Sequence, residues 1–218
     1  MIIEFHGSPP LQIFQEIWRR QIYIREYPVS WRAPRTVVDI GANVGFFSLY
    51  AAQRWKQAAI FAYEPAPENF AQLSKNVQAN NLAQIHTSSR AVAASATSRT
   101  LYLKGESGWH SLWANDTQNT TVVETTTLEE ILTETGHSTI DFLKIDGEGA
   151  EYEILADREE LLKKYVRFIA MEYHESSRHH VDELKQIFAN AQFTCNVIPE
   201  ARLNTGMLTG CNYSLEPH

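Results

Sequence analysis

The sequence predicts a doubly wound α/β domain with a mostly parallel sheet and an antiparallel C-terminal hairpin. Short apolar runs rich in β-branched and aromatic residues recur along the chain, and each is followed by a polar break and a helical pattern. Such alternation is typical of a parallel sheet with helices on both faces. At 218 residues with 44% apolar content, the chain is long enough to bury one sizeable core.

Seven runs predict the strands of this sheet. Two of them, QFTCNVIP and GCNYSLEP near the C-terminus, are separated by a connection that contains glycine, so they predict antiparallel strands at one edge. The other five predict parallel strands, at Thr36–Ile40, Ala59–Tyr63, Ile85–Ser88, Ile140–Ile145 and Arg167–Tyr173.

The helices are predicted from apolar spacing and from helix-start signals. Pro67 fits the first turn of a helix, because its ring is preorganised for that position. Thr127 and Glu130 form a capping box at the start of a short helix, Leu128–Leu132. The first helix after a strand is marked by residues at i, i+3, i+4 and i+7 that share one face, namely Val44, Phe47, Ser48 and Ala51.

The chain divides into an N-terminal extension and one main domain. Residues 1–33 contain a predicted helix, Leu11–Tyr27, that packs on the domain formed by residues 34–218. A variable insert of added strands or extended loop is expected at about residues 100–126, where the helical pattern stops. A last helix is expected at His180–Asn190.

Composition excludes several classes of partner. A net charge of -7 disfavours a nucleic-acid binder, since such binding depends on clustered Lys and Arg. No apolar run reaches the length of a transmembrane helix and no secretory signal is evident, so we expect a cytoplasmic protein without a membrane partner. Cys195 and Cys211 are too few for a disulfide scaffold.

The stretch VVDIGANVGFFSLY, residues 37–50, joins a strand to a glycine turn and predicts a cofactor site. A dinucleotide fingerprint needs three spaced glycines, but Asn43 and Phe46 stand where the second and third belong. What remains is an acid, Asp39, followed by Gly41 and Gly45. An acid favours an ammonium group and helix N–H groups favour a carboxylate, and a methionine moiety carries both.

Glu64 ends the second strand, in YEPAPENF, and can accept hydrogen bonds from both hydroxyls of a ribose. Together with the glycine turn it favours S-adenosylmethionine over a pyrophosphate cofactor. The alternative is a solvated acid that caps the following helix.

Five segments follow one another across about residues 37–193: DIGANVGFFSLYAA, YEPAPENFAQLSKNVQANN, TTLEEIL, DFLKIDGEGAEYEIL and MEYH. In this order they resemble the FkbM family of S-adenosylmethionine-dependent methyltransferases. The resemblance implies a Rossmann-like class I methyltransferase fold and methyl transfer to a hydroxyl of a sugar, polyketide or similar small metabolite. It also implies adenine contacts at Ser89 and Arg90. Two departures are Gly147, where the family commonly has an aliphatic residue, and a short amino end.

Asp146, in the segment KIDGEGAEYEIL, is the first candidate for the base that receives the proton of the acceptor hydroxyl. Glu148 and Glu151 are weaker candidates, because Glu near a helix start is often solvated. Lys144 either faces the substrate or pairs with an acid. Asp39, Gly41, Asn43, Gly45 and Glu64 are expected to hold the cofactor.

Glu172 and His174 alternate with their neighbours in MEYH, so both are expected to face Asp146 as catalytic groups. His174 suits a base, since its ordinary pKa is near working pH. We expect no metal, although an alternative makes Asp146, Glu172 and His174 ligands of a divalent cation.

The loop GESGWHSLW is expected to present Trp109 and His110, with Ser111 and Trp113, to the acceptor. The alternative is a hairpin loop with Trp113 in the core. Three other functions stay open: methyl transfer to an amine, a non-catalytic S-adenosylmethionine-binding module, and a nicotinamide-dependent oxidoreductase.

Overall fold

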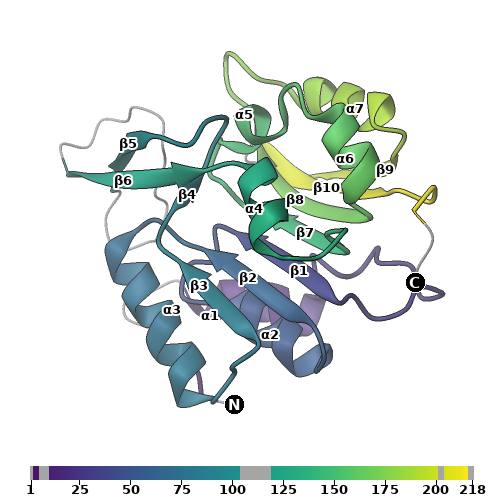
Figure 1. Ribbon diagram of the computed structural model, residues 1–218. Helices are drawn as coiled ribbons and strands as arrows, with labels where there is room; N and C mark the ends of the chain where they lie inside the picture. The colour runs from purple at the N-terminus through teal and green to yellow at the C-terminus, as the bar shows by residue number, and fades with distance from the viewer. Residues whose placement is uncertain (1, 5–9, 104–118, 201–203, 216–218) are drawn as a thin grey trace.

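The computed structural model describes residues 2–4, 10–103, 119–200 and 204–215. In this part of the chain, strands form a seven-stranded sheet in the order β3-β2-β1-β7-β8-β10-β9 and a three-stranded sheet in the order β4-β6-β5 (Figure 1). The strands are β1 Thr36–Ile40, β2 Ala59–Tyr63, β3 Ile85–Ser88, β4 Ala91–Val92, β5 Ser98–Tyr102, β6 Thr120–Thr126, β7 Phe142–Ile145, β8 Phe168–His174, β9 Thr194–Pro199 and β10 Thr205–Cys211.

The larger sheet has the predicted mixture of directions. Its strands β3, β2, β1, β7 and β8 are parallel, whereas β10 is antiparallel to both β8 and β9. The structure therefore confirms a doubly wound, Rossmann-like sheet with antiparallel C-terminal strands. Alternate residues of each strand point to opposite faces of the sheet and form the core on both sides. Val37 and Phe142 belong to the cluster on one face, and Val38 and Leu143 belong to the cluster on the other.

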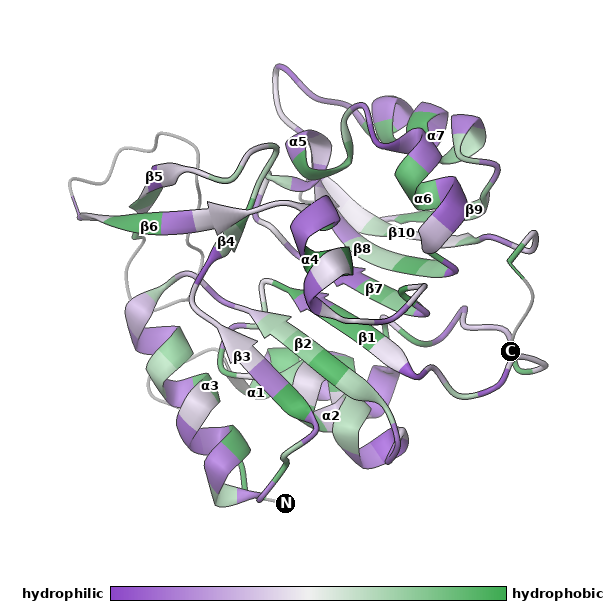
Figure 2. Ribbon diagram, viewed as in Figure 1, coloured by the Kyte–Doolittle hydropathy of each residue, from purple (hydrophilic) through white to green (hydrophobic). Residues whose placement is uncertain are grey.

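The helices cover both faces of the sheet. Residues of η1, α2 and α3 share one buried cluster with one face, and residues of α4, α5, α6 and α7 share another cluster with the opposite face. Figure 2 shows hydrophobic residues along the central strands and hydrophilic residues over much of α3 and α7. The helices are α1 Pro10–Phe14, η1 Gln15–Arg20 (a π-helix), α2 Phe46–Arg54, α3 Pro67–Ala79, α4 Leu128–Glu134, α5 Glu151–Leu155, α6 Glu159–Tyr165 and α7 Val181–Asn190.

The N-terminal helix is shorter than the predicted Leu11–Tyr27. It ends at Arg20, because Gln21 adopts a left-handed conformation with φ 55° and its N–H bonds to the carbonyl of Glu16. The following turn directs Tyr23 and Ile24 into the core, and both are buried. In a continuous helix these two apolar side chains would point to different parts of the helix surface. The turn lets both be buried, and their burial stabilises the break in the helix.

The second strand of the C-terminal hairpin is Thr205–Cys211, earlier in the chain than the predicted GCNYSLEP. Gly206, the glycine of the predicted connection, therefore lies inside a strand, and a Cβ there would lie 2.6 Å from the carbonyl oxygen of Ile198. The strand ends at Cys211, and the side-chain amide of the next residue, Asn212, donates to the carbonyl oxygens of Lys163 and Val166. Within the described residues no helix is both long and apolar enough to cross a bilayer.

Candidate active site

The candidate site lies at the carboxyl ends of the parallel strands. β1, β2, β7 and β8 run in one direction, so the loops that follow them meet along one edge of the sheet. The glycine turn (residues 41–45) follows β1, Glu64 follows β2, Asp146 follows β7, and His174 is the last residue of β8. Groups that are far apart in the sequence are therefore neighbours in space.

The glycine turn packs directly against the end of β7. Gly41 has φ +71°, and a Cβ at this position would overlap the carbonyl oxygen of Asp146. Gly45 has φ +94°, and a Cβ there would lie 2.7 Å from Leu73 Cδ1, between the turn and α3. Both positions therefore require glycine for the backbone conformation and for space.

Asp39 does not face the site as predicted. Its side chain is fully buried, Oδ2 accepts a hydrogen bond from Ser48 Oγ at 2.6 Å, and Oδ1 lies 3.1 Å from Lys144 Nζ. Asp39 is also not among the described residues that line the pockets below. The prediction of a direct contact with a cofactor ammonium group is wrong, because both carboxylate oxygens are occupied inside the protein.

Lys144 supports the glycine turn from behind. Its ammonium donates to the carbonyl oxygen of Gly41 at 2.7 Å and lies 3.7 Å from Asp146 Oδ2. Burial by itself lowers the pKa of Lys144, but the charges of Asp39 and Asp146 outweigh it and leave the pKa above its usual value. Of the two roles left open by the sequence, the structure shows the pairing with acids, and only 3% of the side chain is exposed.

Glu64 forms a preorganised acceptor at the end of β2. Its Oε2 accepts from the backbone N–H of Asn43 at 2.8 Å, and its Oε1 accepts from the N–H of Ala66 at 2.9 Å. Burial raises the pKa of Glu64 to about 7, although these two hydrogen bonds and the charge of Lys144 lower it. The carboxyl group is therefore tied to the glycine turn and titrates near neutral pH.

Two adjoining pockets open at this edge of the sheet. The first, called the Glu64 pocket, encloses about 600 Å³ of space that includes open solvent, and its apolar wall is formed by Tyr63, Pro65, Ala91, Val92, Leu101 and Ile154. The second, called the Glu172 pocket, encloses about 1010 Å³ that also includes open solvent, and its apolar wall is formed by Ile13, Ile17, Ile22, Tyr23, Phe46 and Phe47. The two pockets share Gly41, Asn43, Asp146 and Glu148.

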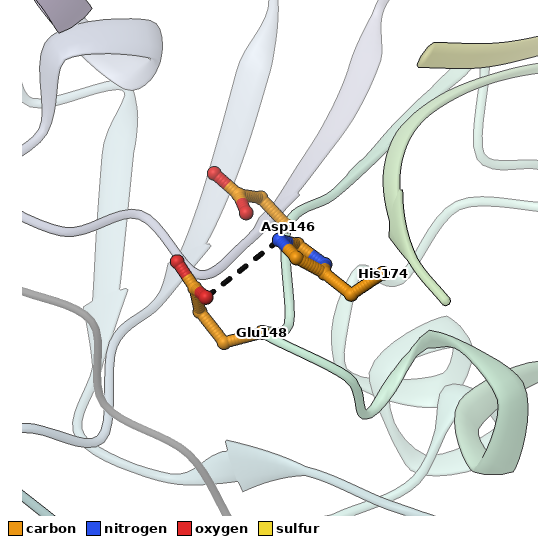
Figure 3. Close-up of side chains that lie close together, drawn as sticks. All are labelled: Asp146, Glu148 and His174. Atoms are coloured by element: carbon orange, nitrogen blue, oxygen red, sulfur yellow. Dashed lines mark ion pairs between the residues drawn. The ribbon is translucent and has the colours of Figure 1, made fainter. Parts of the chain in front are cut away.

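A group of acids surrounds His174 where the pockets meet. His174 Nε2 lies 3.6 Å from Glu148 Oε2, and Asp146 belongs to the same cluster (Figure 3). On its other side, His174 Nδ1 lies 3.0 Å from Oε1 of the fully buried Glu151. That oxygen also accepts from the N–H of Gly147 at 3.0 Å, so Glu151 fixes both the loop and the imidazole.

The charges in this group change the predicted role of His174. Burial by itself lowers the pKa of His174, but the hydrogen bond and charge of Glu151, with the charges of Glu148 and Asp146, raise it to about 10. The imidazole is therefore protonated at neutral pH and cannot receive the proton of an acceptor in this state. These charges argue against His174 as the base, and that role stays a prediction.

Glu172 and Tyr23 complete the polar surface of the Glu172 pocket. Burial, with the charges of Asp146 and Glu148, raises the pKa of Glu172 to about 8, against the lowering effect of His174 and Lys144. Tyr23 donates a hydrogen bond from its hydroxyl to Asp146 Oδ2 at 3.2 Å. Tyr23 was not predicted, and its only signal in the sequence was its place in the expected N-terminal extension.

Ser89 and Arg90, for which the resemblance implied adenine contacts, lie next to residues of the Glu64 pocket in the sequence, and those contacts stay a prediction. Arg90 forms an ion pair with Glu134 at 2.6 Å, and its Nε donates to Ser88 Oγ. Neither Ser89 nor Arg90 is among the described residues that line the two pockets. The adjacent apolar residues of β4 line the Glu64 pocket instead. Trp109, His110, Ser111 and Trp113 lie outside the described residues.

Comparison with known proteins identifies the family. Residues 39–195 match the model of the FkbM methyltransferase domain. Methyltransferase sdnD of Sordaria araneosa is 31% identical over 173 residues, which are 65% of this chain and 67% of that protein. The 31-O-demethyl-FK506 methyltransferase FkbM of Streptomyces tacrolimicus is 26% identical over 193 residues, which are 75% of this chain and 74% of that protein.

Solved structures support the fold. The methyltransferase FkbM of Methylobacillus flagellatus KT superimposes with a TM-score of 0.59 and 15% identity, over 87% of this chain and 47% of that one. The N-terminal domain of human METTL16 in complex with SAH superimposes with a TM-score of 0.52 and 18% identity, over 96% of this chain and 73% of that one. These likenesses are at the level of fold. Because the family model covers most of the sheet and the site, the chain belongs to the FkbM family of S-adenosylmethionine-dependent methyltransferases.

Proposed function

We propose that the protein transfers the methyl group of S-adenosylmethionine to a hydroxyl of a small metabolite, sugar or polyketide-like acceptor. The observation that carries the proposal is the meeting of two pockets at Asp146. One pocket has the acid and apolar wall that suit a nucleoside, and the other is larger and open to a second molecule. Family membership favours this interpretation over a non-catalytic module and over a nicotinamide-dependent oxidoreductase.

In the proposed complex the adenosine moiety occupies the Glu64 pocket. Glu64 is nearly buried and already oriented by two backbone hydrogen bonds, so it accepts the ribose hydroxyls without losing freedom on binding. The adenine ring packs on the apolar wall near Val92 and Leu101, which takes the place of Ser89 and Arg90 in our account. The methionine end passes over Gly41 toward the start of α2.

The acceptor occupies the Glu172 pocket, with its hydroxyl beside Asp146. Asp146 lines both pockets, so it is the group that both molecules reach. In the reaction the acceptor oxygen attacks the methyl carbon, the carbon–sulfur bond breaks, and the sulfur leaves as a neutral thioether. Asp146 receives the hydroxyl proton, and the protein contributes mainly by holding the two reactants in line.

Transfer to a hydroxyl oxygen is supported by one named relative. The Streptomyces tacrolimicus protein is described as a 31-O-demethyl-FK506 methyltransferase, which names an O-methyl transfer. The apolar wall from the N-terminal segment, with Ile13 and Ile17, offers surface for the carbon skeleton of such an acceptor.

The experiment is methyl transfer from isotopically labelled S-adenosylmethionine to a panel of hydroxylated and amino acceptors, with products identified by mass spectrometry. We expect label on an oxygen, and loss of most activity in Asp146→Asn while Asp157→Asn stays close to wild type. Asp157 is an exposed residue beyond α5, so it controls for the loss of a surface carboxylate. Label on nitrogen with every active acceptor would contradict the O-methyl proposal.

A further inference from the structure

We propose that Asp146, Glu148 and His174 bind one divalent cation where the two pockets meet, and that this cation holds and activates the acceptor hydroxyl. The inference rests on the proposed function for its role in the reaction. The binding site itself rests on the geometry of these three side chains, which come from the end of β7, the loop after it and the end of β8.

The three side chains offer a compact donor set. One carboxylate oxygen of Asp146, one of Glu148 and one imidazole nitrogen of His174 all lie within 4.8 Å of one another. Ligand atoms bound to one cation at about 2.1 Å stand roughly 3–4 Å apart. The distance of 3.6 Å between His174 Nε2 and Glu148 Oε2 already falls in that range. Figure 3 shows all three groups gathered on one side of the loop.

The histidine is held in the orientation that a metal ligand needs. Its Nδ1 is directed at Glu151, so when a cation displaces the Nε2 proton the ring still donates from Nδ1, and its Nε2 lone pair is on the side of Glu148. Glu151 is fully buried and also accepts from the N–H of Gly149, so it cannot turn away. A carboxylate behind a ligating imidazole is the usual arrangement in metal sites, where it fixes the ring and raises its basicity.

The fourth acid, Glu172, stands outside the donor set. The alternative raised from the sequence named Glu172 as a ligand, but among the described residues it is Glu148 that joins Asp146 and His174. Glu148 has φ 50°, an uncommon conformation for a residue with a side chain. This turn brings its carboxylate back toward β8. Glu172 lines the same pocket and is free of the cation in this arrangement.

The cation would act as a Lewis acid on the acceptor hydroxyl. Coordination weakens the O–H bond, and the proton passes to the carboxylate oxygen of Asp146 that does not bind the cation, so Asp146 keeps its role as the base while the oxygen attacks the methyl carbon. The carbon–sulfur bond breaks, and S-adenosylhomocysteine leaves with the electron pair on sulfur. Two carboxylates and one imidazole, with positions left for the hydroxyl and water, suit Mn²⁺ and related divalent cations.

The test is calorimetric titration of the metal-free protein with Mn²⁺. We expect one equivalent to bind in the wild type, and at least tenfold weaker binding in both Glu148→Gln and His174→Ala. The matched controls are Glu160→Gln, an exposed acid on α6, and His137→Ala, an exposed histidine before β7 at the opposite end of the strand. Both controls should bind Mn²⁺ as the wild type does.

Two results would overturn the inference: absence of saturable Mn²⁺ binding to the wild type, or binding that neither site variant weakens. If His174→Ala does not fold by circular dichroism, Glu148→Gln decides the matter, since it preserves shape and side-chain volume. Titration with S-adenosylhomocysteine in EDTA separates the two proposals. If the protein binds S-adenosylhomocysteine but not Mn²⁺, the proposed function stands and the metal site is excluded. If it binds Mn²⁺ but not S-adenosylhomocysteine, the metal site stands and the proposed function is excluded.

Discussion

A methyl group on Gly41 would overlap the peptide oxygen of Asp146, so the turn after β1 and the end of β7 are in direct contact. The contact joins Gly41 of the glycine turn to Asp146, which lines both pockets. It also requires a left-handed backbone at Gly41, where φ is +71°.

Gly41→Ala should therefore destabilise the fold by about 3 kcal/mol or more, since it combines an unfavourable φ with a backbone clash. The measurement is chemical denaturation. Gly136→Ala is the matched control, because Gly136 has φ +63° but no atom within 4 Å of a new Cβ. Gly136→Ala should lower the free energy of unfolding by only about 1 kcal/mol. Equal losses in the two variants would show that the contact with Asp146 carries no energy.

The affinity for S-adenosylhomocysteine should rise with pH through the pKa of Glu64. Below about pH 7 the carboxyl group holds a proton and loses an acceptor for the ribose hydroxyls, and above it the carboxylate accepts from both. If only the ionised form binds, the affinity rises roughly tenfold from about pH 6 to about pH 8. Calorimetry across this range measures the effect. Glu64→Gln should bind more weakly with a flat profile, and an equally steep profile in that variant would assign the titration to another group.

Lys144→Met should cost about 3–5 kcal/mol of unfolding free energy, because it leaves the charge of Asp39 buried without its partner. Adding Asp39→Asn removes that charge, so the double variant should recover a large part of the loss. Thermal or chemical denaturation of the two single variants and the double variant measures the coupling. Simple additivity would mean that the pair does not stabilise the turn as a unit.

Tyr23→Phe should lower kcat/KM by roughly tenfold while changing the free energy of unfolding by less than about 1 kcal/mol, since it removes the hydrogen bond that orients Asp146. Tyr27→Phe provides the control. It removes a hydroxyl from the same N-terminal segment, but that hydroxyl donates to the carbonyl of Arg32, away from the site. Steady-state kinetics of both variants distinguish a positioning role from a general effect on packing.

The central strands could be predicted from the sequence because burial on both faces leaves a continuous apolar run. Thr36–Ile40 is buried at every position, and its bounds were predicted correctly. The second strand of the hairpin was placed too late, because Gly206 was assigned to the connection between the two strands. Only the structure shows that Gly206 lies inside β10, in close contact with Tyr173 and Ile198.

The sequence predicted where the site lies better than it predicted which residues contact one another there. Asp39 was assigned to the cofactor because the pairing of Asp39 with Lys144 depends on the register between β1 and β7, which a sequence does not display. Glu148 was ranked low because a Glu near a helix start is often solvated, whereas alternation along a strand predicts Glu172 and His174 on one side. The left-handed turn at Glu148 follows no periodicity, so its approach to His174 could not be foreseen.

Cofactor binding at Glu64 is measured by calorimetric titration with S-adenosylhomocysteine of the wild type, Glu64→Ala and the control Glu68→Ala, with NADH as a second ligand. Glu68 is an exposed acid in the first turn of α3, close to Glu64 in sequence. We expect saturable binding to the wild type and to Glu68→Ala, at least tenfold weaker binding to Glu64→Ala, and no binding of NADH. Absence of S-adenosylhomocysteine binding to the wild type, or equal binding to Glu64→Ala, would contradict cofactor binding at Glu64.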